Sequence, residues 1–281
     1  MVSLELNQDH CIRCGRCISV CPQRILGRHT NGSVDVLHGA LARCIRCGHC
    51  VAVCPADAIR LPGGREEEIL PYDPAQFDIP PEQLMNFMKF RRSVRQFKDK
   101  PVEREKLELL LETARYSPTG GNQQKNRYIL LDRDKEELTE LALKTLYDVA
   151  GRPGGEEELP GLKRYRERWR GMYPAWKERR KDGLFYGAAC VLMVVSRNPG
   201  AGSGRLDAGL ASANMELMAH ALGLGACYIG FFTMAAELEP ELYRRLGIQE
   251  GEEVVSTLAI GYPAVQYRRT VNRDPADLTR L

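Results

Sequence analysis

Eight of the ten cysteines fall in two copies of one short pattern, C-x2-C-x2-C-x3-C-P. This spacing is typical of bacterial domains with two 4Fe-4S clusters, in which three thiolates of one run bind three irons of a cube and the fourth cysteine reaches the other cube. We therefore expect two 4Fe-4S clusters that exchange their fourth ligands, with electron transfer as their use. The expected ligand sets are Cys11, Cys14, Cys17 and Cys54 for one cluster, and Cys44, Cys47, Cys50 and Cys21 for the other.

Structural zinc is the main alternative, because C-x2-C is also half of a zinc knuckle. A zinc site takes two separated pairs, whereas each run here holds three closely spaced cysteines. Disulfides are a second alternative, but thiols this close in sequence cannot all pair well, and the N-terminus lacks the basic and apolar regions of a signal peptide. The pattern favours clusters, and we expect a cytoplasmic protein whose thiolates stay reduced.

A second group of chemistry-bearing residues is the basic turn Arg91-Arg92-Ser93-Val94-Arg95. Guanidinium groups and a hydroxyl bind phosphate oxygens through charge-assisted hydrogen bonds, although a basic turn is often simply solvated. Residues 117–122 follow as a turn of small residues, which lets the backbone approach a flat ligand. Near the end of the chain, Arg268 and Arg269 return basic groups that are able to reach the same phosphate.

The cysteine runs belong to an internal repeat. Residues 10–26 recur at 43–59 with an offset of 33, and nine of the 17 positions are identical. Each copy predicts a cluster loop, a short helix after the proline and an apolar exit. We expect a ferredoxin-like domain at 1–65 that has little core of its own and is held together by its metal, and an extended linker at 66–80 that is rich in proline and acid.

The remaining residues, 81–281, form the second predicted domain. Apolar residues recur at helical spacing in 84–88, 107–114 and 134–150, and strands are expected at 128–131, 184–196, 225–232 and 254–260. A long helix is expected between Asp207, as its cap, and Gly223. Cys190 and Cys227 lie in apolar strands and are expected to be inert core thiols.

Residues 163–181 combine nine basic and two acidic residues with four aromatic ones, Tyr165, Trp169, Tyr173 and Trp176. Such a mixture is found in nucleic-acid-binding segments and also in mobile lids whose aromatic rings close over a stacked cofactor or substrate. We favour the lid. The net charge of +3 indicates no polyanionic partner, and the longest apolar run, 184–195, is too short to span a bilayer. We therefore expect neither a nucleic acid nor a membrane as partner.

Over residues 81–281 the chain resembles the FMN-dependent nitroreductase family. The matching features, in order, are Arg91 to Phe97, the Ser-Pro-x-Gly-x-Asn-x-Gln turn, the Phe-Tyr-Gly-Ala strand entry, the Asp207 to Gly225 helix and Ile-Gly-Tyr-Pro. The whole chain resembles the ferredoxin–nitroreductase fusions of anaerobic bacteria and archaea. The resemblance implies an α+β fold with a central sheet flanked by helices, an intertwined homodimer, and one FMN per subunit at the dimer interface.

The resemblance also implies roles for individual residues. Arg91, Arg92 and Ser93 would hold the FMN phosphate, helped by Arg268 or Arg269, and Arg95 would approach the pyrimidine edge, where its charge stabilises the anionic reduced flavin. The small-residue turn would contribute Ser117, Asn122 and Gln124 to the ring or ribityl chain, while Ile229 and Gly230 would bring backbone N–H groups near flavin N5. Lys125-Asn126 stands where the family often has Pro-Trp, so a different substrate pocket is expected.

The predicted function is an oxidoreductase whose flavin does the chemistry, with no side chain expected as an obligatory acid or nucleophile. An external donor, such as ferredoxin or NAD(P)H, would reduce the protein, and electrons would pass between the clusters and FMN to a small organic acceptor that is nitroaromatic or quinone-like. The alternatives are a non-catalytic electron relay, and a dehalogenation or dehydrogenation linked to ferredoxin.

Overall fold

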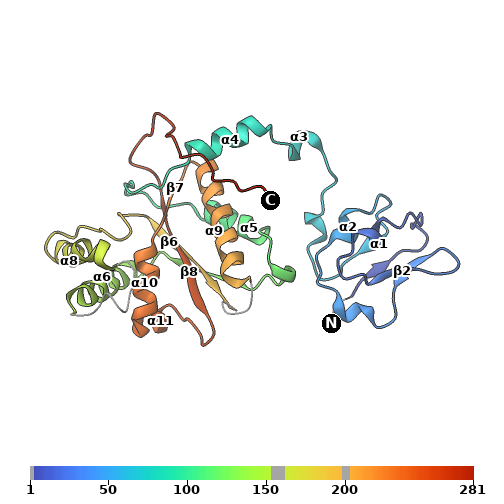
Figure 1. Ribbon diagram of the computed structural model, residues 1–281, viewed down its shortest axis with the longest axis horizontal. Coiled ribbons are helices and arrows are strands. Elements are labelled where there is room, and N and C mark those ends of the chain that lie inside the picture. The colour runs from blue at the N-terminus through green and yellow to red at the C-terminus, as the bar shows by residue number, and fades with distance from the viewer. Residues whose placement is uncertain (1–2, 153–161, 198–202) are drawn as a thin grey trace. The chain divides into compact units, whose positions relative to one another are not determined.

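The computed structural model describes residues 3–152, 162–197 and 203–281, and its contacts divide the chain into two units (Figure 1). The first unit takes in the chain up to Asp78 together with Gly121–Gln123, and the second takes in Ile79–Gly120 and Gln124–Leu281. Two short helical segments, η2 (Glu66–Glu68) and α3 (Pro74–Phe77), lie where a wholly extended linker is expected. The domain boundaries at 65 and 81 stay a prediction.

The first unit consists of two similar halves. The outer strands β1 (Glu5–Leu6) and β4 (Ile59–Arg60) pair antiparallel, as do β2 (Leu26–Arg28) and β3 (Val34–Val36). The helices are α1 (Arg16–Val20), η1 (Ala40–Arg43) and α2 (His49–Ala52). The largest buried side chains of its small core cluster are Ile25, Leu26, Val34 and Ile59.

The repeat is visible in the backbone itself. Gly15 and Gly48, 33 residues apart, both adopt the left-handed conformation (φ 77° and 73°), and so do Arg13 and Arg46 (58° and 53°). The short helix of each half begins directly after its glycine. The prediction of a helix after the proline is therefore wrong, because the helix lies before it. Helix α1 ends ahead of Cys21, which is extended, since proline disfavours helical backbone in the residue before it.

The second unit is built around a four-stranded antiparallel sheet of order β5-β6-β8-β7. Its strands are β5 (Asn126–Leu131), β6 (Cys190–Ser196), β7 (Gly225–Tyr228) and β8 (Glu253–Gly261). The predicted strand at 184–196 begins only at Cys190, because the Asp182 carboxylate accepts hydrogen bonds from the backbone N–H groups of Leu184, Phe185 and Gly187 and folds that segment into a turn.

Helices cover both faces of this sheet (Figure 1). Val191 and Met193 of β6 pack into one core with helices α6, α8, α10 and α11, whereas Leu192 and Val194 face a second core with α5 and α9. This alternation is that of a strand buried on both sides, and it confirms the predicted α+β class. The helices are α4 (Pro81–Phe90), α5 (Arg104–Arg115), α6 (Lys135–Gly151), α8 (Leu162–Arg179), α9 (Gly204–Ala221), α10 (Gly230–Leu238) and α11 (Pro240–Arg245), with the turn η3 at Gly120–Asn122.

Helix α8 is a core element, so the prediction that its tryptophans belong to a lid is wrong. Trp169 is 0 % exposed and Trp176 is 6 % exposed, and both lie in the core that α8 forms together with α6. Aromatic side chains bury large apolar areas, and the helix turns these two inward while most of its basic residues stay at the surface. Both tryptophans of the chain therefore report on the folding of the second unit.

Helix α9 begins earlier than expected. Ser203 occupies its N-cap position, and Asp207 lies in the first turn, where its carboxylate accepts hydrogen bonds from the Gly120 N–H (3.1 Å) and the Ser203 hydroxyl (3.0 Å). Asp207 thus ties the helix to the small-residue turn and is not the cap. Gly223, with φ 72°, ends the helix as predicted.

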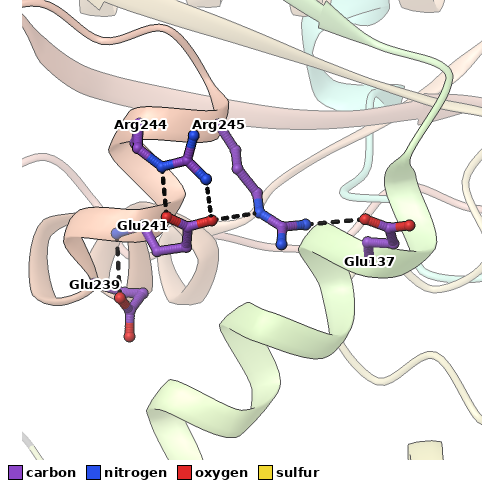
Figure 2. A network of polar contacts seen from close by, with 5 residues as sticks. All are labelled: Glu137, Glu239, Glu241, Arg244 and Arg245. Atoms are coloured by element: carbon purple, nitrogen blue, oxygen red, sulfur yellow. Dashed lines mark hydrogen bonds and ion pairs between the residues drawn. The ribbon is translucent and has the colours of Figure 1, made fainter.

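Helix α11 is fastened to α6 by charged groups at the surface (Figure 2). The Glu241 carboxylate accepts hydrogen bonds from Arg244 and Arg245, and Arg245 also reaches Glu137 of α6 at 2.9 Å. The two guanidinium groups lower the pKa of Glu241 to about 2. No helix among the described residues is long and apolar enough to cross a membrane.

Gly225 provides a test of the packing at β7. A Cβ atom at this position would lie 2.6–2.9 Å from the side-chain carbons of Val94. We expect Gly225→Ala to lower the free energy of unfolding by about 1–3 kcal/mol, because the two backbones could no longer approach so closely. Tryptophan fluorescence during denaturation measures this. Gly209→Ala, on α9 with open space around it, is the control and should stabilise the unit by about 0.5–1 kcal/mol.

Candidate functional site

The eight motif cysteines line two separate cavities in the first unit, and each cavity takes cysteines from both runs. One is lined by Cys11, Cys14, Cys17 and Cys54, and the other by Cys21, Cys44, Cys47 and Cys50. These are the crosswise sets that the spacing predicts. Four thiols around one small cavity are a donor set that fits an iron–sulfur cube. No three His, Cys, Asp or Glu side chains in the described ranges converge closely enough for a single metal ion.

Burial dominates the ionisation of the inner thiols. It raises the pKa of Cys17, and the neighbouring thiols of Cys11 and Cys54 add to the rise. Burial likewise raises the pKa of Cys50 to about 11, with contributions from Cys47 and Cys21. Thiols that oppose one another's ionisation require a cationic centre to hold them as thiolates together, which is what a cluster's iron provides.

Hydrogen bonds from arginine side chains, and one to a cysteine sulfur, stabilise the backbone around the cavities. The Arg28 guanidinium donates to the carbonyl oxygens of Arg13 and Gly32, and Arg46 donates to that of Pro62. The Ala58 N–H donates to the sulfur of Cys54 at 3.3 Å. Hydrogen bonds to cluster sulfurs are one means by which a protein sets a reduction potential.

In the second unit, the basic turn is held against the end of β7. The Val94 N–H donates to the Ala226 carbonyl at 3.0 Å, and Ser93 forms a parallel bridge with the same residue. Further along, the Lys98 N–H donates to the carbonyl of Tyr262 at 2.8 Å. These bonds fix the turn beside the strand that leads into Ile229 and Gly230.

A cavity of about 330 Å³ opens beside this turn. Arg91, Arg92, Glu216, His220 and Tyr267 contribute its polar lining. Arg91 forms an ion pair with Glu216 at 2.6 Å, and the side chain of Glu216 is only 10 % exposed. The cavity therefore combines two guanidinium groups with one largely buried carboxylate.

The charges in the cavity act on one another. Burial raises the pKa of Glu216, while Arg91 opposes that rise. Burial lowers the pKa of His220, and the charge of Arg91 lowers it further. His220 packs against the ring of Phe87, with centroids 4.7 Å apart. A neutral imidazole and a single carboxylate leave the cavity cationic, which suits an anion.

The other predicted site residues are distributed around this turn. Burial raises the pKa of the Cys227 thiol, and the charge of Arg95 opposes this rise. Ile229 is buried, and its N–H donates to the Thr257 carbonyl at 2.8 Å, which directs the chain into Gly230, the first residue of α10. Arg268 and Arg269 are exposed and follow Tyr267 of the cavity directly.

The small-residue turn is engaged in other contacts. Ser117 is buried, and its hydroxyl accepts a hydrogen bond from Asn214 at 2.8 Å. Asn122 belongs to the first unit by its contacts, and its amide donates to the carbonyl oxygens of Ile45 and Arg46 at 2.9 and 3.0 Å. The Gln124 N–H donates to Thr119. Roles for Ser117, Asn122 and Gln124 toward a cofactor stay predictions.

The sequence did not predict three residues of the cavity lining, Glu216, His220 and Tyr267. Glu216 and His220 stand one helical turn apart on an otherwise apolar stretch of α9. Since a charged residue is rarely buried without a partner, an acid in such a stretch is a signal for a buried cation nearby. Nothing in the sequence identifies Arg91, 125 positions away, as that cation.

Two family models match the chain. The Nitroreductase family covers residues 88–262, and a 4Fe-4S dicluster domain covers residues 10–59. A 4-nitrobenzoate reductase from Nocardioides sp. (strain LMS-CY) is 28% identical over an alignment of 214 residues, which covers 66% of this chain and 84% of that protein.

Solved structures show the same fold for the second unit. A nitroreductase with bound FMN from Bacteroides fragilis superposes with a TM-score of 0.54 at 22% identity, covering 70% of this chain and 99% of that one. Another with bound FMN, from Desulfitobacterium hafniense, gives 0.52 at 25% identity over 67% and 93% of the two chains. The resemblance inferred from the sequence is confirmed.

The Arg91–Glu216 pair can be tested through stability. Arg91→Ala leaves a mostly buried carboxylate without its cation, so we expect the free energy of unfolding to fall by about 1–3 kcal/mol at neutral pH. Because the Glu216 pKa is raised, this deficit should shrink as the pH falls and the carboxyl becomes neutral. Denaturation followed by tryptophan fluorescence measures both effects.

The matched control is Arg91→Ala combined with Glu216→Gln, which removes the unpaired charge and should recover most of the loss. A double variant no more stable than Arg91→Ala would contradict the role of the pair.

Proposed function

Because the chain is an oxidoreductase of the nitroreductase family with an N-terminal 4Fe-4S dicluster domain, we propose that electrons pass between two 4Fe-4S clusters and FMN and reduce a small organic acceptor. The proposed acceptor is nitroaromatic or quinone-like. The proposed donor is external, a ferredoxin or NAD(P)H. The protein would work in a reducing cytoplasm, where cysteine thiolates persist.

The cationic cavity at the basic turn carries this proposal. When bound, FMN supplies the redox chemistry, and the residues of this chain supply binding, orientation and charge. Arg91 and Arg92 line the cavity, and Ser93 is bridged to β7 beside it. We propose that these three residues hold the FMN phosphate, with Arg268 or Arg269 completing the set, since guanidinium forks match phosphate oxygens.

From the cavity, β7 leads toward the proposed ring site. Arg95 lies near Cys227, two residues before Ile229, and its charge would stabilise negative charge on a reduced ring. Gly230 begins α10, and the first N–H groups of a helix have no partner within that helix. This end of α10 is therefore suited to donate a backbone N–H to a ring nitrogen.

The two cysteine-lined cavities support the proposal of two clusters. Each brings together four thiols, three from one run and one from the other. We propose that each set binds one 4Fe-4S cluster, which supplies one-electron transfer, and that the thiolates and the Ala58 N–H at Cys54 set its potential.

A homodimer is proposed from the surface of the second unit. An apolar groove of about 470 Å³ runs among α4, α5 and α9, with Leu84, Phe87 and Met218 in its lining. Next to it, Met85 is 52 % exposed and Met88 is 43 % exposed. Contiguous apolar surface of this kind marks an interaction site. We propose that a second copy of the chain covers it, as the resemblance to the family implies.

Double cysteine variants test the crosswise ligand sets. Cys21→Ser with Cys50→Ser changes two ligands of one proposed cluster, so about half of the iron should remain. Cys17→Ser with Cys21→Ser changes one ligand of each cluster, so most of the iron should be lost, although both residues lie in one run. Iron content and electron paramagnetic resonance of the reduced proteins measure this. The opposite ranking of the two variants would refute the crosswise sets.

Anaerobic stopped-flow tests the proposed electron path. With reduced ferredoxin as donor and no acceptor present, we expect iron–sulfur absorbance to fall first and flavin absorbance afterwards.

In Arg92→Ala, FMN affinity should fall by about 10- to 100-fold, because one charge-assisted bond to the phosphate is lost. The flavin phase should then shrink while the iron content stays unchanged.

Lys98→Ala, on the same segment but outside the cavity lining, is the control and should keep both phases. Full flavin occupancy in Arg92→Ala would contradict the phosphate site. Rapid flavin reduction by NAD(P)H, with the clusters reduced afterwards, would instead identify the clusters as an outlet for electrons.

A further inference from the structure

Arg168 of α8 presents a guanidinium group at the start of α10. Its Nη2 donates a hydrogen bond to the Tyr186 hydroxyl at 2.7 Å, and its Cζ lies 5.1 Å from the ring centroid of Phe231. Both contacts are with neutral groups, so among the residues that the structure describes they leave the positive charge uncompensated. Phe231 directly follows Gly230, where the proposed function places the flavin ring.

Tyr186 is held in place by a strained turn. Its φ of 59° is left-handed, which is unusual for a bulky residue, and Gly187 follows at φ 74°. The Asp182 carboxylate maintains this turn by accepting the N–H groups of Leu184, Phe185 and Gly187. Backbone strain that is over-determined by neighbouring bonds often marks a functional position.

Phe231 is supported from behind. Tyr165 meets it edge to face at 5.0 Å, and the buried Trp169 lies perpendicular to it at 5.4 Å. Phe231 itself stays partly exposed. The aromatic residues that the sequence suggested for a lid thus hold one ring rigidly, with a cation over it.

The charge of Arg168 also reaches Cys227, next to the proposed ring site. Burial raises the pKa of Cys227 and the charge of Glu216 adds to the rise, while the charges of Arg95 and Arg168 oppose it. The two arginines come from different elements, the basic turn and α8, and both act on the end of β7. Their combined field favours an anion at this place.

We propose that Arg168 and Tyr186 bind the carboxylate of an aromatic acceptor whose ring lies against Phe231. This inference rests on the proposed function and names the substrate class of that site. A guanidinium group matches a carboxylate with two parallel hydrogen bonds. The Tyr186 oxygen accepts from Arg168, so its own O–H proton remains to be donated to the carboxylate. Edge-to-face packing on Phe231 would orient the acceptor ring, because the Arg168 guanidinium already lies over a face of Phe231.

The test compares two acceptors of nearly equal size, 4-nitrobenzoate and the neutral 4-nitrobenzamide, with reduced methyl viologen as donor to the holoenzyme. We expect Arg168→Gln to raise KM for 4-nitrobenzoate by about 10- to 100-fold, which corresponds to one lost charge-assisted carboxylate contact. KM for 4-nitrobenzamide should change by no more than about twofold. Tyr186→Phe should show a smaller effect with the same selectivity.

Arg164→Gln is the matched control, because it removes a charge one turn earlier on α8, where the guanidinium lies over Tyr165. It should leave KM for both acceptors unchanged. An equal rise in KM for the two acceptors in Arg168→Gln would show that Arg168 only supports the packing of Phe231. An unchanged KM for both would show that Arg168 does not contact the acceptor. Both results overturn the inference.

Calorimetric titration with benzoate and benzamide separates this inference from the proposed function. Benzoate should bind the wild-type holoenzyme and lose affinity in Arg168→Gln, even if no nitro compound is turned over. Turnover of 4-nitrobenzamide without preferential binding of benzoate would support the proposed function and refute the carboxylate site.

Discussion

The backbone pairing of residues 93–98 with the ends of β7 and β8 is the constraint on which the candidate flavin site depends. Hydrogen bonds from Val94 and Lys98 hold this segment to the carbonyl groups of Ala226 and Tyr262. Gly225 makes the approach possible, because any side chain there would meet Val94. Since main-chain bonds set the register, the arginines before and within the segment are placed by the sheet rather than by their own flexible side chains.

Charge around this site is unevenly balanced. Arg91 is paired with the largely buried Glu216, whereas the charges of Arg95 and Arg168 both act on the end of β7. A buried carboxylate beside an arginine that is proposed to bind phosphate keeps the guanidinium in position but repels an anion. Burial raises its pKa, so the carboxylate gives up its charge, and with it that repulsion, at a higher pH than an exposed glutamate would. The arrangement suits a site that must hold an anion and keep its arginine ordered.

The first unit follows a different principle. Its buried apolar cluster is small, and the cysteines themselves form part of it. Paired left-handed residues, such as Gly15 and Gly48, turn the backbone around the cavities. With so little apolar area to bury, a fold of this size gains stability from metal binding. Six of the eight motif cysteines accordingly lie in or against the small core.

The sequence by itself determined the features that depend on residues close together in the chain: the thiol sets and their 33-residue offset, the helices α4, α5, α6 and α9, the end of α9 at Gly223 and the basic turn. Tertiary structure decided what depends on distant partners. It alone paired Arg91 with Glu216, buried Trp169 and Trp176 where a lid was predicted, and delayed β6 to Cys190 through Asp182. The physical reason is that spacing, caps and turns act within a few residues, whereas burial and ion pairing depend on which surfaces the whole chain brings together.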